Sequence, residues 1–275
     1  MTATLGESPV TAFFEGDADF WGDVYGHEDA FGATIQRRHA RAQAWIADLQ
    51  LPASSSVLEV GCGAGFLSVA LAQRGLEVTA VDAAPAMVSA TRRRAADAGV
   101  AQRLAAAVAD VHQLTFEPAT FDLAVSLGVL PWLHTPAAAV AEMSRVLRPN
   151  GWLVMSADNR LSLVHLLDPL RNPSLAPLKH AISRRLRRAE PSQCRPRADS
   201  WKAVDRMLGD AGLQVVARTT CGFGPPTLFH RRLIPQRLAS DLDRCLQALA
   251  DRRVAGIHAL GWHHMVLARK AAAGA

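Results

Sequence analysis

Short apolar runs alternate with helical patterns from residue 57 to residue 157. The apolar runs have the length of buried strands, and they span residues 57–60, 76–81, 103–109, 121–127 and 152–157. Apolar positions recur at helical spacing in the segments between them, at residues 66–72, 87–98 and 137–147. An earlier helical pattern contains Trp45, Ile46 and Leu49 and ends at Pro52. Strands and helices that alternate in this way predict right-handed βαβ units around a parallel sheet, so the expected fold class is α/β.

The pattern changes after Asp158. Residues 161–198 contain five prolines between short apolar stretches, which predicts a helical lid with bends. Two further strands are expected, at residues 213–219 and within residues 257–268, with a helix between them over residues 235–250. The apolar positions of that helix share one face, and they are Leu238, Leu242, Leu246 and Leu249. We therefore expect four parts: a helical cap (1–50), a core (51–160), a basic, proline-rich lid (161–200) and a segment that completes the core (201–275).

Three features with ligand-binding chemistry fall at the ends of the predicted strands, where open α/β sheets bind their ligands. The run Glu59-Val60-Gly61-Cys62-Gly63-Ala64-Gly65 joins the first strand to a helix, whose free N–H groups favour a carboxylate or phosphate. Asp82 comes 21 positions after Gly61 and can accept both hydroxyls of a ribose, and Asp110 can accept an adenine amine. Together they indicate a nucleoside with a small polar tail. The loop differs from the dinucleotide fingerprint, because Phe66 stands where a third glycine is expected.

These residues belong to a wider similarity. The chain resembles the class I S-adenosylmethionine-dependent methyltransferases, most closely the branch with the ubiquinone, menaquinone and natural-product enzymes. The resemblance covers about residues 45–160, and its motifs are VLEVGCGAGFLS (57–68), VTAVD (78–82), Asp110-Val111, Phe121-Asp122-Leu123 and RVLRPNGW (145–152). Asn150 stands where the family commonly has glycine, at a turn position that Asn tolerates.

The resemblance implies a Rossmann-like three-layer sandwich with a seven-stranded, mostly parallel sheet of order 3-2-1-4-5-7-6, strand 7 antiparallel, carrying cap and lid inserts. It implies S-adenosylmethionine as cofactor and S-adenosylhomocysteine as product. The methionine part would lie over Gly61, Cys62, Gly63 and Gly65. Asp82 would hold the ribose with Ala83 and Met87 beside it, Asp110 and the Val111 N–H would hold adenine, and Leu127 would lie beside the sulfonium.

Two residues leave alternatives open. Glu59 either contacts the cofactor's amino group or organises the loop, or else it is a buried structural acid. Tyr25, the only tyrosine, either caps the cofactor or substrate, or packs as a hydrophobic staple of the N-terminal helix. Trp152 and Trp262 are expected in the core.

A sulfonium methyl group is already activated, so the protein mainly has to position the acceptor and exclude water. Candidate general bases follow the fourth and fifth strands, and they are His134, Asp158 and His165. No metal site is indicated, because no C-x-x-C occurs and His263 and His264 would point to opposite faces of a strand. The four cysteines are expected to be free thiols.

Composition supports a globular chain, with 49% hydrophobic and 20% charged residues. No apolar run reaches the roughly 18 residues that span a bilayer, and the acidic N-terminus lacks a secretory pattern, so the cytoplasm is the expected location. Residues 171–202 contain nine Lys or Arg and two acidic residues, a net charge of +7 within a chain of net charge +5. The Arg184–Arg188 run is either a solvated helix face or a weak contact for an anionic partner or membrane surface.

The expected function is methylation of a small, partly apolar acceptor, with oxygen favoured over carbon or nitrogen, in quinone, isoprenoid or secondary-metabolite biosynthesis. A nucleic-acid methyltransferase is the alternative, but the Asn/Asp-Pro-Pro-Tyr/Phe motif is missing after the fourth strand and no aromatic-studded basic groove is evident. A repurposed cofactor-binding protein and a nicotinamide dehydrogenase are further alternatives. We expect no nucleic-acid partner, and a monomer or homodimer.

Overall fold

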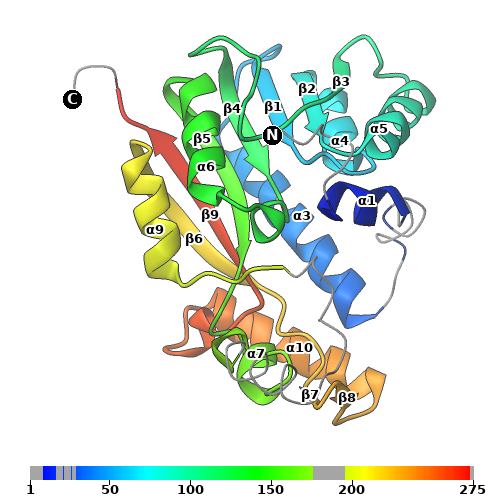
Figure 1. Cartoon of the computed structure of the whole chain (residues 1–275), viewed down its shortest axis with the longest axis vertical. Coiled ribbons are helices and arrows are strands. Elements are labelled where there is room, and N and C mark those ends of the chain that lie inside the picture. The colour runs from blue at the N-terminus through cyan, green and yellow to red at the C-terminus, as the bar shows by residue number, and fades with distance from the viewer. Residues whose placement is uncertain (1–8, 17–20, 22–25, 27–28, 176–195, 273–275) are drawn as a thin grey trace.

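The chain folds around a twisted seven-stranded sheet (Figure 1). This computed structural model describes residues 9–16, 21, 26, 29–175 and 196–272. The strand order is β3-β2-β1-β4-β5-β9-β6; β9 is antiparallel to both neighbours, and the other pairs are parallel. The strands are β1 (Ser56–Val60), β2 (Glu77–Asp82), β3 (Leu104–Val108), β4 (Phe121–Ser126), β5 (Leu147–Asp158), β6 (Leu213–Cys221) and β9 (His263–Lys270). The predicted fold class and strand order are confirmed, because β9 is the seventh strand of this sheet along the chain.

Helices cover both faces of the sheet and complete a three-layer sandwich (Figure 1). Helices α3, α4 and α5 pack on one face, and α6 and α9 pack on the other. The helices are α1 (Pro9–Gly16), α3 (Ala30–Asp48), α4 (Phe66–Gln73), α5 (Pro85–Asp97), α6 (Pro136–Val146), α7 (Leu163–Leu167), α9 (Trp201–Asp210) and α10 (Gln236–Asp251), with short 3-10 turns η3 (Leu130–Trp132), η4 (Pro173–Leu175) and η5 (Ile257–Ala259). None of these described helices is long and apolar enough to cross a membrane.

The central strands are buried on both faces, and their side chains alternate between two cores. Val57 and Leu123 belong to the core under α3, α4 and α5, whereas Leu58 and Ala124 belong to the core under α6 and α9. Parallel strands covered on both faces have continuous apolar sequences. This is why short apolar runs were enough to locate them.

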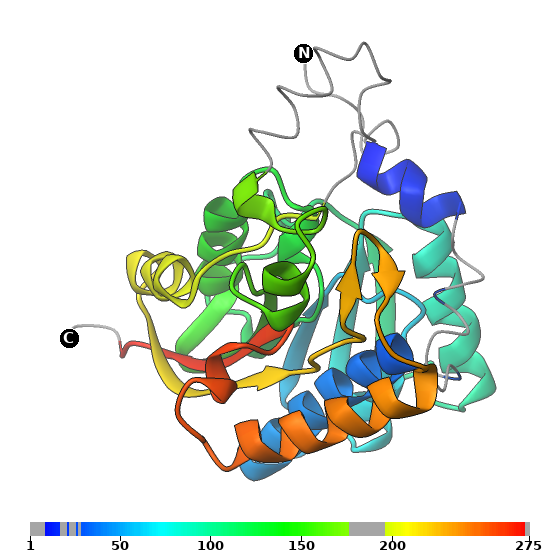
Figure 2. The same ribbon diagram turned by 90° about the horizontal axis from the view of Figure 1, so that it is seen from below.

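Three elements lie beyond the carboxyl ends of the parallel strands: α7, α10 and the hairpin of β7 (Thr227–Leu228) and β8 (Arg231–Arg232) (Figures 1 and 2). The fully buried Asp168, which follows α7, ties the first part of the expected lid to this hairpin. Its carboxylate accepts hydrogen bonds from the Thr227 hydroxyl (2.8 Å) and from the N–H groups of Phe229 (3.1 Å) and His230 (2.8 Å). Residues 176–195 of the lid, including Arg184–Arg188, lie outside the described residues, and the four-part division of the chain stays a prediction.

Helix α10 forms where expected, but its leucine-rich face is not the buried one. Leu238 and Leu242 are 57% and 39% exposed. The buried face instead carries Asp243 and Gln247, whose side chains accept hydrogen bonds from the N–H groups of Phe223 (2.7 Å) and Gly222 (2.9 Å). The chain leaves β6 at residues 222–223, where its buried N–H groups need hydrogen-bond acceptors. Polar side chains therefore occupy the buried face of α10.

Strand β5 begins five residues earlier than predicted. Leu147 already pairs with Phe121, and an irregular register between Phe121 and Leu123 accommodates the Arg148–Gly151 segment. Asn150 adopts a φ of 66° in this segment, which agrees with the turn conformation expected there.

Candidate active site

One cavity of about 1130 Å³ opens at the carboxyl ends of the parallel strands. Residues that follow β1, β2, β3 and β4, and the last residue of β5, contribute to its lining, as do α1 and α3. Asp82 and Asp110 both line it, so the strand-end acids converge on a common space as the sequence indicated.

The glycine loop after β1 is held tightly against its neighbours. The N–H groups of Gly61 (2.7 Å) and Cys62 (3.1 Å) both donate to the Val81 carbonyl at the end of β2. A Cβ at Gly61, where φ is 71°, would lie 2.1 Å from a Val129 methyl, whereas a Cβ at Gly63 would meet nothing within 4 Å. Glycine at 61 is therefore required by loop packing, and Gly63 is the position that leaves room for a ligand.

The Asp82 carboxylate is fixed by backbone donors. The Gly63 N–H donates to Oδ2 (2.9 Å) and the Ala84 N–H donates to Oδ1 (3.0 Å). Burial raises the pKa of Asp82, and these hydrogen bonds partly oppose the rise. Each oxygen keeps a further lone pair, so the oriented carboxylate can accept two ligand hydroxyls.

Asp110 forms a small cluster with two histidines. His112 Nδ1 lies 2.7 Å from Asp110 Oδ1, and the rings of His112 and His134 are 4.0 Å apart. Burial alone would raise the pKa of Asp110, but the hydrogen bonds from His112 and the charge of His134 hold it below its usual value. His134, a candidate base, therefore lies in the same cluster as Asp110, the acid assigned to adenine.

Glu59 is buried and also borders the cavity. The Ser68 hydroxyl, from the first turn of α4, donates a hydrogen bond to its carboxylate. Burial raises the pKa of Glu59 to about 8; the bond from Ser68 opposes the rise and the neighbouring Asp82 adds to it. This contact supports the loop-organising role among the two alternatives left open by the sequence.

Arg38 is a buried cation that the sequence analysis missed. Its side chain comes from α3, lines the cavity and is 8% exposed as a residue. No described residue accepts a hydrogen bond from it or forms an ion pair with it. Its guanidinium lies against Gly128, where a Cβ would come within 2.7 Å of a guanidinium nitrogen. An unpaired buried guanidinium is costly, so this position suits a ligand carboxylate.

A continuous row of aromatic rings also lines the cavity, which we call the aromatic row. Phe13 stacks on Trp132 with centroids 5.4 Å apart, and Phe31 lies 5.9 Å from Trp262. The row consists of Phe13, Phe14, Trp21, Phe31, Trp132 and Trp262. Trp262 was expected in the core, but it faces the cavity because residue 262 precedes β9 at its open end. The row gives the cavity an apolar wall.

Asp158, at the end of β5, lies beside His263, at the start of β9. The two residues are cross-strand partners, with His263 Nδ1 2.9 Å from Asp158 Oδ1, and both line the cavity. His165 is outside the lining, and its Nδ1 lies 2.8 Å from the Asn159 carbonyl. His264 packs on Trp201 at 3.8 Å, away from the cavity. No group of three or more His, Cys, Asp or Glu among the described residues is arranged to hold a metal ion.

The cavity thus collects most of the residues proposed from the sequence. Of the cofactor set, it is lined by Glu59, Gly61, Cys62, Gly63, Asp82, Ala83, Met87, Asp110, Val111 and Leu127. Gly65 is not in the lining, and Tyr25 lies outside the described residues. Of the candidate bases, His134 and Asp158 line the cavity and His165 does not.

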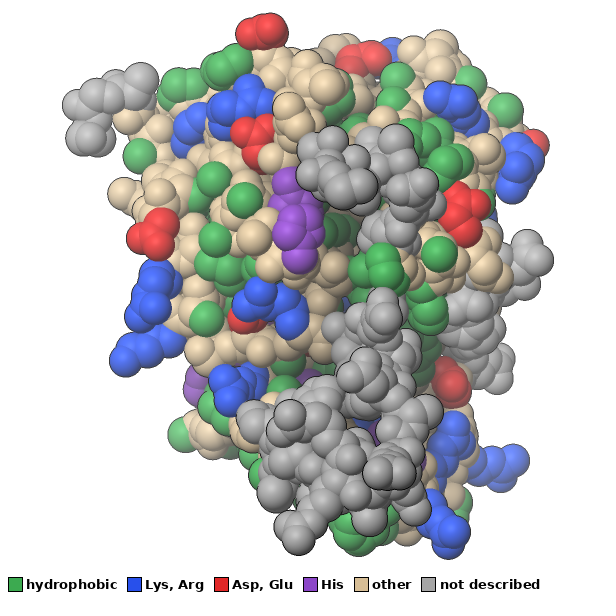
Figure 3. Space-filling model, viewed as in Figure 1, with side chains coloured by type: hydrophobic (Ala, Val, Ile, Leu, Met, Phe, Trp, Pro, Cys, Tyr) green, Lys and Arg blue, Asp and Glu red, His purple; other side chains and the backbone are tan. Residues whose placement is uncertain are grey.

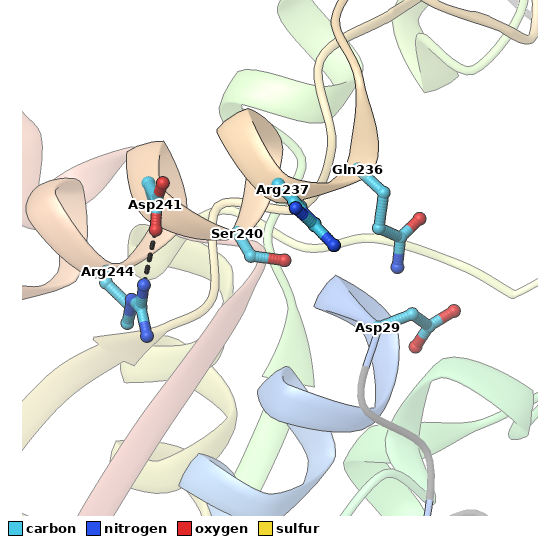
Figure 4. Close-up of a pocket in the computed structure, with 6 residues that line it drawn as sticks. All are labelled: Asp29, Gln236, Arg237, Ser240, Asp241 and Arg244. Carbon is cyan, nitrogen blue, oxygen red and sulfur yellow. Dashed lines mark hydrogen bonds and ion pairs between the residues drawn. The ribbon is translucent and has the colours of Figure 1, made fainter.

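A second hollow, of about 520 Å³, lies between the starts of α3 and α10 (Figure 4). It is lined by Asp29, Gln236, Arg237, Ser240, Asp241 and Arg244. Asp29 caps α3 by accepting from the Gly32 N–H (2.8 Å), and Asp241 pairs with Arg244. These acids have structural partners, so we place the active site in the larger cavity.

The fold and this cavity define a class of protein. The sequence model of the family described as "Methyltransferase domain" matches residues 58–155. The chain has the fold, and carries the domain, of the class I S-adenosylmethionine-dependent methyltransferases, so the identification made from the sequence is confirmed. S-adenosylmethionine, the predicted cofactor, is the methyl donor of this class.

Individual relatives match parts of the chain. A ubiquinone biosynthesis O-methyltransferase of Pseudomonas paraeruginosa is 34% identical over 122 residues, which are 42% of this chain and 50% of that protein. The chain therefore matches only about half the length of this curated relative.

Solved structures share the fold at low identity. Magnesium protoporphyrin IX methyltransferase from Synechocystis, with bound SAH, has a TM-score of 0.61 at 18% identity and covers 95% of this chain and 98% of its own. The cyclase SpnF has a TM-score of 0.55 at 18% identity, over 84% and 80% of the two chains.

Proposed function

We propose that this protein transfers the methyl group of S-adenosylmethionine to a small, partly apolar organic acceptor, with oxygen as the favoured accepting atom. The observation that carries the proposal is one cavity in which Asp82, Asp110 and the glycine loop meet the aromatic row. When bound, S-adenosylmethionine supplies a methyl group activated by a sulfonium centre.

The lining fits such a donor along its length. Asp82 offers two oriented acceptors for the ribose hydroxyls, and Asp110 has a carboxylate oxygen left for the adenine amine beside the Val111 N–H. Arg38 supplies a buried cation for the methionine carboxylate, next to Gly128. Leu127 would then border the reacting methyl group.

The aromatic row supports an acceptor with substantial apolar surface. Its rings exclude water from the cavity and would stack on a flat or unsaturated molecule. The relative named for ubiquinone biosynthesis supports oxygen as the accepting atom and quinone-type biosynthesis as the setting. Charged side chains of both signs are interspersed on the face in Figure 3, which favours a small molecule over a nucleic acid.

Cofactor binding is tested by calorimetry with S-adenosylhomocysteine. Replacing Asp82 with Ala removes a charge-assisted pair of hydrogen bonds, and we expect a loss of about 2–4 kcal/mol, or roughly 30- to 1000-fold in Kd. The matched control is Asp97→Ala, an exposed acid at the end of α5, which should keep the wild-type affinity. Equal affinities for all three proteins would contradict the assignment of the cavity.

Transfer is tested with methyl-labelled S-adenosylmethionine and a panel of phenols, hydroxylated quinones, amines and activated-carbon acceptors. We expect label in an organic-extractable ether product, and no transfer by Asp82→Ala. Label found only in RNA, or bound cofactor with no transfer to any acceptor in the panel, would contradict the proposed reaction.

A further inference from the structure

The general base of the proposed reaction was left open by the sequence, and the structure narrows the choice. His165 lies outside the cavity lining, and His134 sits with Asp110 and His112. His264 is turned toward Trp201, and burial lowers its pKa to about 3. His112 also lines the cavity, but its Nδ1 lies 2.7 Å from Asp110, the acid assigned to adenine. Among the described residues, His263, which the sequence analysis treated only as a poor metal ligand, is the histidine that lines the cavity outside that cluster, beside Trp262.

We propose that His263 is the catalytic base that removes the acceptor's hydroxyl proton, and that Asp158 is the positioning residue that orients it. This inference rests on the proposed function. It deepens that function by assigning the acceptor an ionisable O–H group, as in a phenol or an enol.

The geometry of the pair fits this division of roles. Asp158 Oδ1 lies 2.9 Å from His263 Nδ1, and their side chains are only 14% and 7% exposed. A carboxylate at this distance favours the tautomer with hydrogen on Nδ1, which leaves a lone pair on Nε2. His263 Nε2 is buried and has no hydrogen-bond partner among the described residues.

A buried nitrogen without a partner is destabilising, and a ligand hydroxyl in the cavity would supply the missing partner. Two other described histidines also have an unpartnered ring nitrogen. His264 does not line the cavity, and His112 lines it but pairs with Asp110, at the place assigned to adenine rather than to the acceptor. His263 therefore combines an unpartnered Nε2 with a ring at the cavity wall, beside Trp262 of the aromatic row and apart from the Asp110 cluster.

The backbone around the pair is rigid. Asp158 and His263 face each other in the antiparallel β5–β9 ladder, and the Asn159 N–H donates to the Trp262 carbonyl at 2.7 Å. The Asn159 side chain also donates to the carbonyls of Ala259 (2.7 Å) and Gly261 (2.8 Å). These bonds fix the start of β9, so the imidazole needs little reorganisation to act.

The acceptor O–H proton moves to His263 Nε2, and the oxygen lone pair forms the bond to the methyl carbon. The carbon–sulfur bond breaks with its electron pair on sulfur, which gives the thioether S-adenosylhomocysteine and a methyl ether. Asp158 stabilises the imidazolium until its proton passes to water.

The positioning role can be tested without an acceptor. Nitrogen-15 NMR of the histidine side chains reports the tautomer, and His263→Gln identifies the signal. We expect His263 to carry its hydrogen on Nδ1 in the wild type. Asp158→Asn should shift the population toward the Nε2–H form, because an amide can donate to Nδ1. A wild-type ring protonated on Nε2, or a tautomer unaffected by Asp158→Asn, would overturn the proposal.

The catalytic role can be tested with 4-nitrophenol, whose phenolate absorbs visible light, in the presence of saturating S-adenosylhomocysteine. We expect bound phenolate below the pH at which free probe ionises, and a loss of about 10-fold or more in His263→Gln. His165→Gln is the matched control and should behave as the wild type. Among the described residues, His165 and His264 are titratable groups that interact with the pair, so both tests are run at one fixed pH.

The outcomes separate this inference from the proposed function. Absence of bound phenolate in the wild type, or equal phenolate in His263→Gln, with normal S-adenosylhomocysteine affinity, overturns the base assignment alone. Failure of the wild type to bind S-adenosylhomocysteine overturns the proposed function as well. If His263→Gln does not fold, Asp158→Asn replaces it in the phenolate test and should likewise reduce the band.

Discussion

Replacing Glu59 with Gln should change how the stability of the protein depends on pH. Glu59 lies in β1 with 4% exposure and accepts a hydrogen bond from the Ser68 hydroxyl. Burial raises its pKa from 4.5 to about 8 in the folded protein. The folded state therefore holds a proton that the unfolded chain has already released at neutral pH.

The sign of the effect follows from proton binding. Between pH 4.5 and about 8, the folded state binds more protons at Glu59 than the unfolded state does, so the free energy of unfolding falls as pH rises. At 1.36 kcal/mol per pH unit, the full difference corresponds to about 5 kcal/mol, an upper value for one group. A Gln at this position has no proton to lose, and its amide oxygen can still accept from Ser68.

The assay is urea unfolding followed by tryptophan fluorescence, using the six tryptophans, at pH values from 5 to 9 and without cofactor. We expect the wild type to lose stability across this range relative to Glu59→Gln, with the variant the more stable protein by several kcal/mol at pH 9. Glu117→Gln, at an exposed acid, is the control and should follow the wild type. Parallel curves for wild type and Glu59→Gln would show that Glu59 does not titrate in this range.

Two further predictions concern a ligand contact and a structural contact. Arg38→Ala should weaken S-adenosylhomocysteine binding by about 1.5–3 kcal/mol, or roughly 10- to 150-fold, while leaving the affinity for methylthioadenosine, which lacks the amino-acid part, unchanged. Equal losses for both ligands in calorimetry would place Arg38 elsewhere in the site. Asp168→Asn should lower the free energy of unfolding by about 1–3 kcal/mol, because an amide replaces a buried acceptor of four hydrogen bonds, the fourth from the Leu170 N–H. The exposed Asp241→Asn is its control in urea unfolding, and equal stability of the two variants would refute the anchoring role.

The glycine loop and the acids of the cavity lining could be predicted from the sequence, because local patterns determine where they fall. Asp82 and Asp110 each directly follow an apolar run and Glu59 lies near the end of another, and the carboxyl ends of parallel strands meet at one edge of the sheet. Strand order required the family resemblance, since short apolar runs alone do not tell which strands are neighbours. The exposed leucines of α10 show the limit of periodicity. The buried face of that helix is polar because its side chains accept hydrogen bonds from the backbone N–H groups of Gly222 and Phe223, which the pattern within the helix does not reveal.

Arg38 and His263 could not be found in the same way. Arg38 is one charge among several on a helix, and only the tertiary structure shows that it is buried with no partner among the described residues. His263 and Asp158 are separated by 105 residues and meet through the antiparallel pairing of β5 and β9. The family resemblance did contain a signal for this pair. It implied that the seventh strand is antiparallel to the fifth, and in such a pair the start of one strand lies opposite the end of the other.

The residues proposed to hold the cofactor and the aromatic row come largely from different parts of the chain. The similarity to known proteins covers mainly the first of these two groups. The matched domain, residues 58–155, contains the glycine loop and both strand-end acids, so the proposed cofactor contacts other than Arg38 lie in the segment that matches the family. In the aromatic row only Trp132 lies within that segment; the remaining rings come from residues 13–31 and from Trp262, and His263 follows directly. Proteins can therefore share the domain and the donor while differing in the acceptor. We expect exchange of residues 13–31 with those of a related enzyme to change acceptor preference while leaving S-adenosylhomocysteine affinity near the wild-type value, because Asp82, Asp110 and Arg38 would all remain in place.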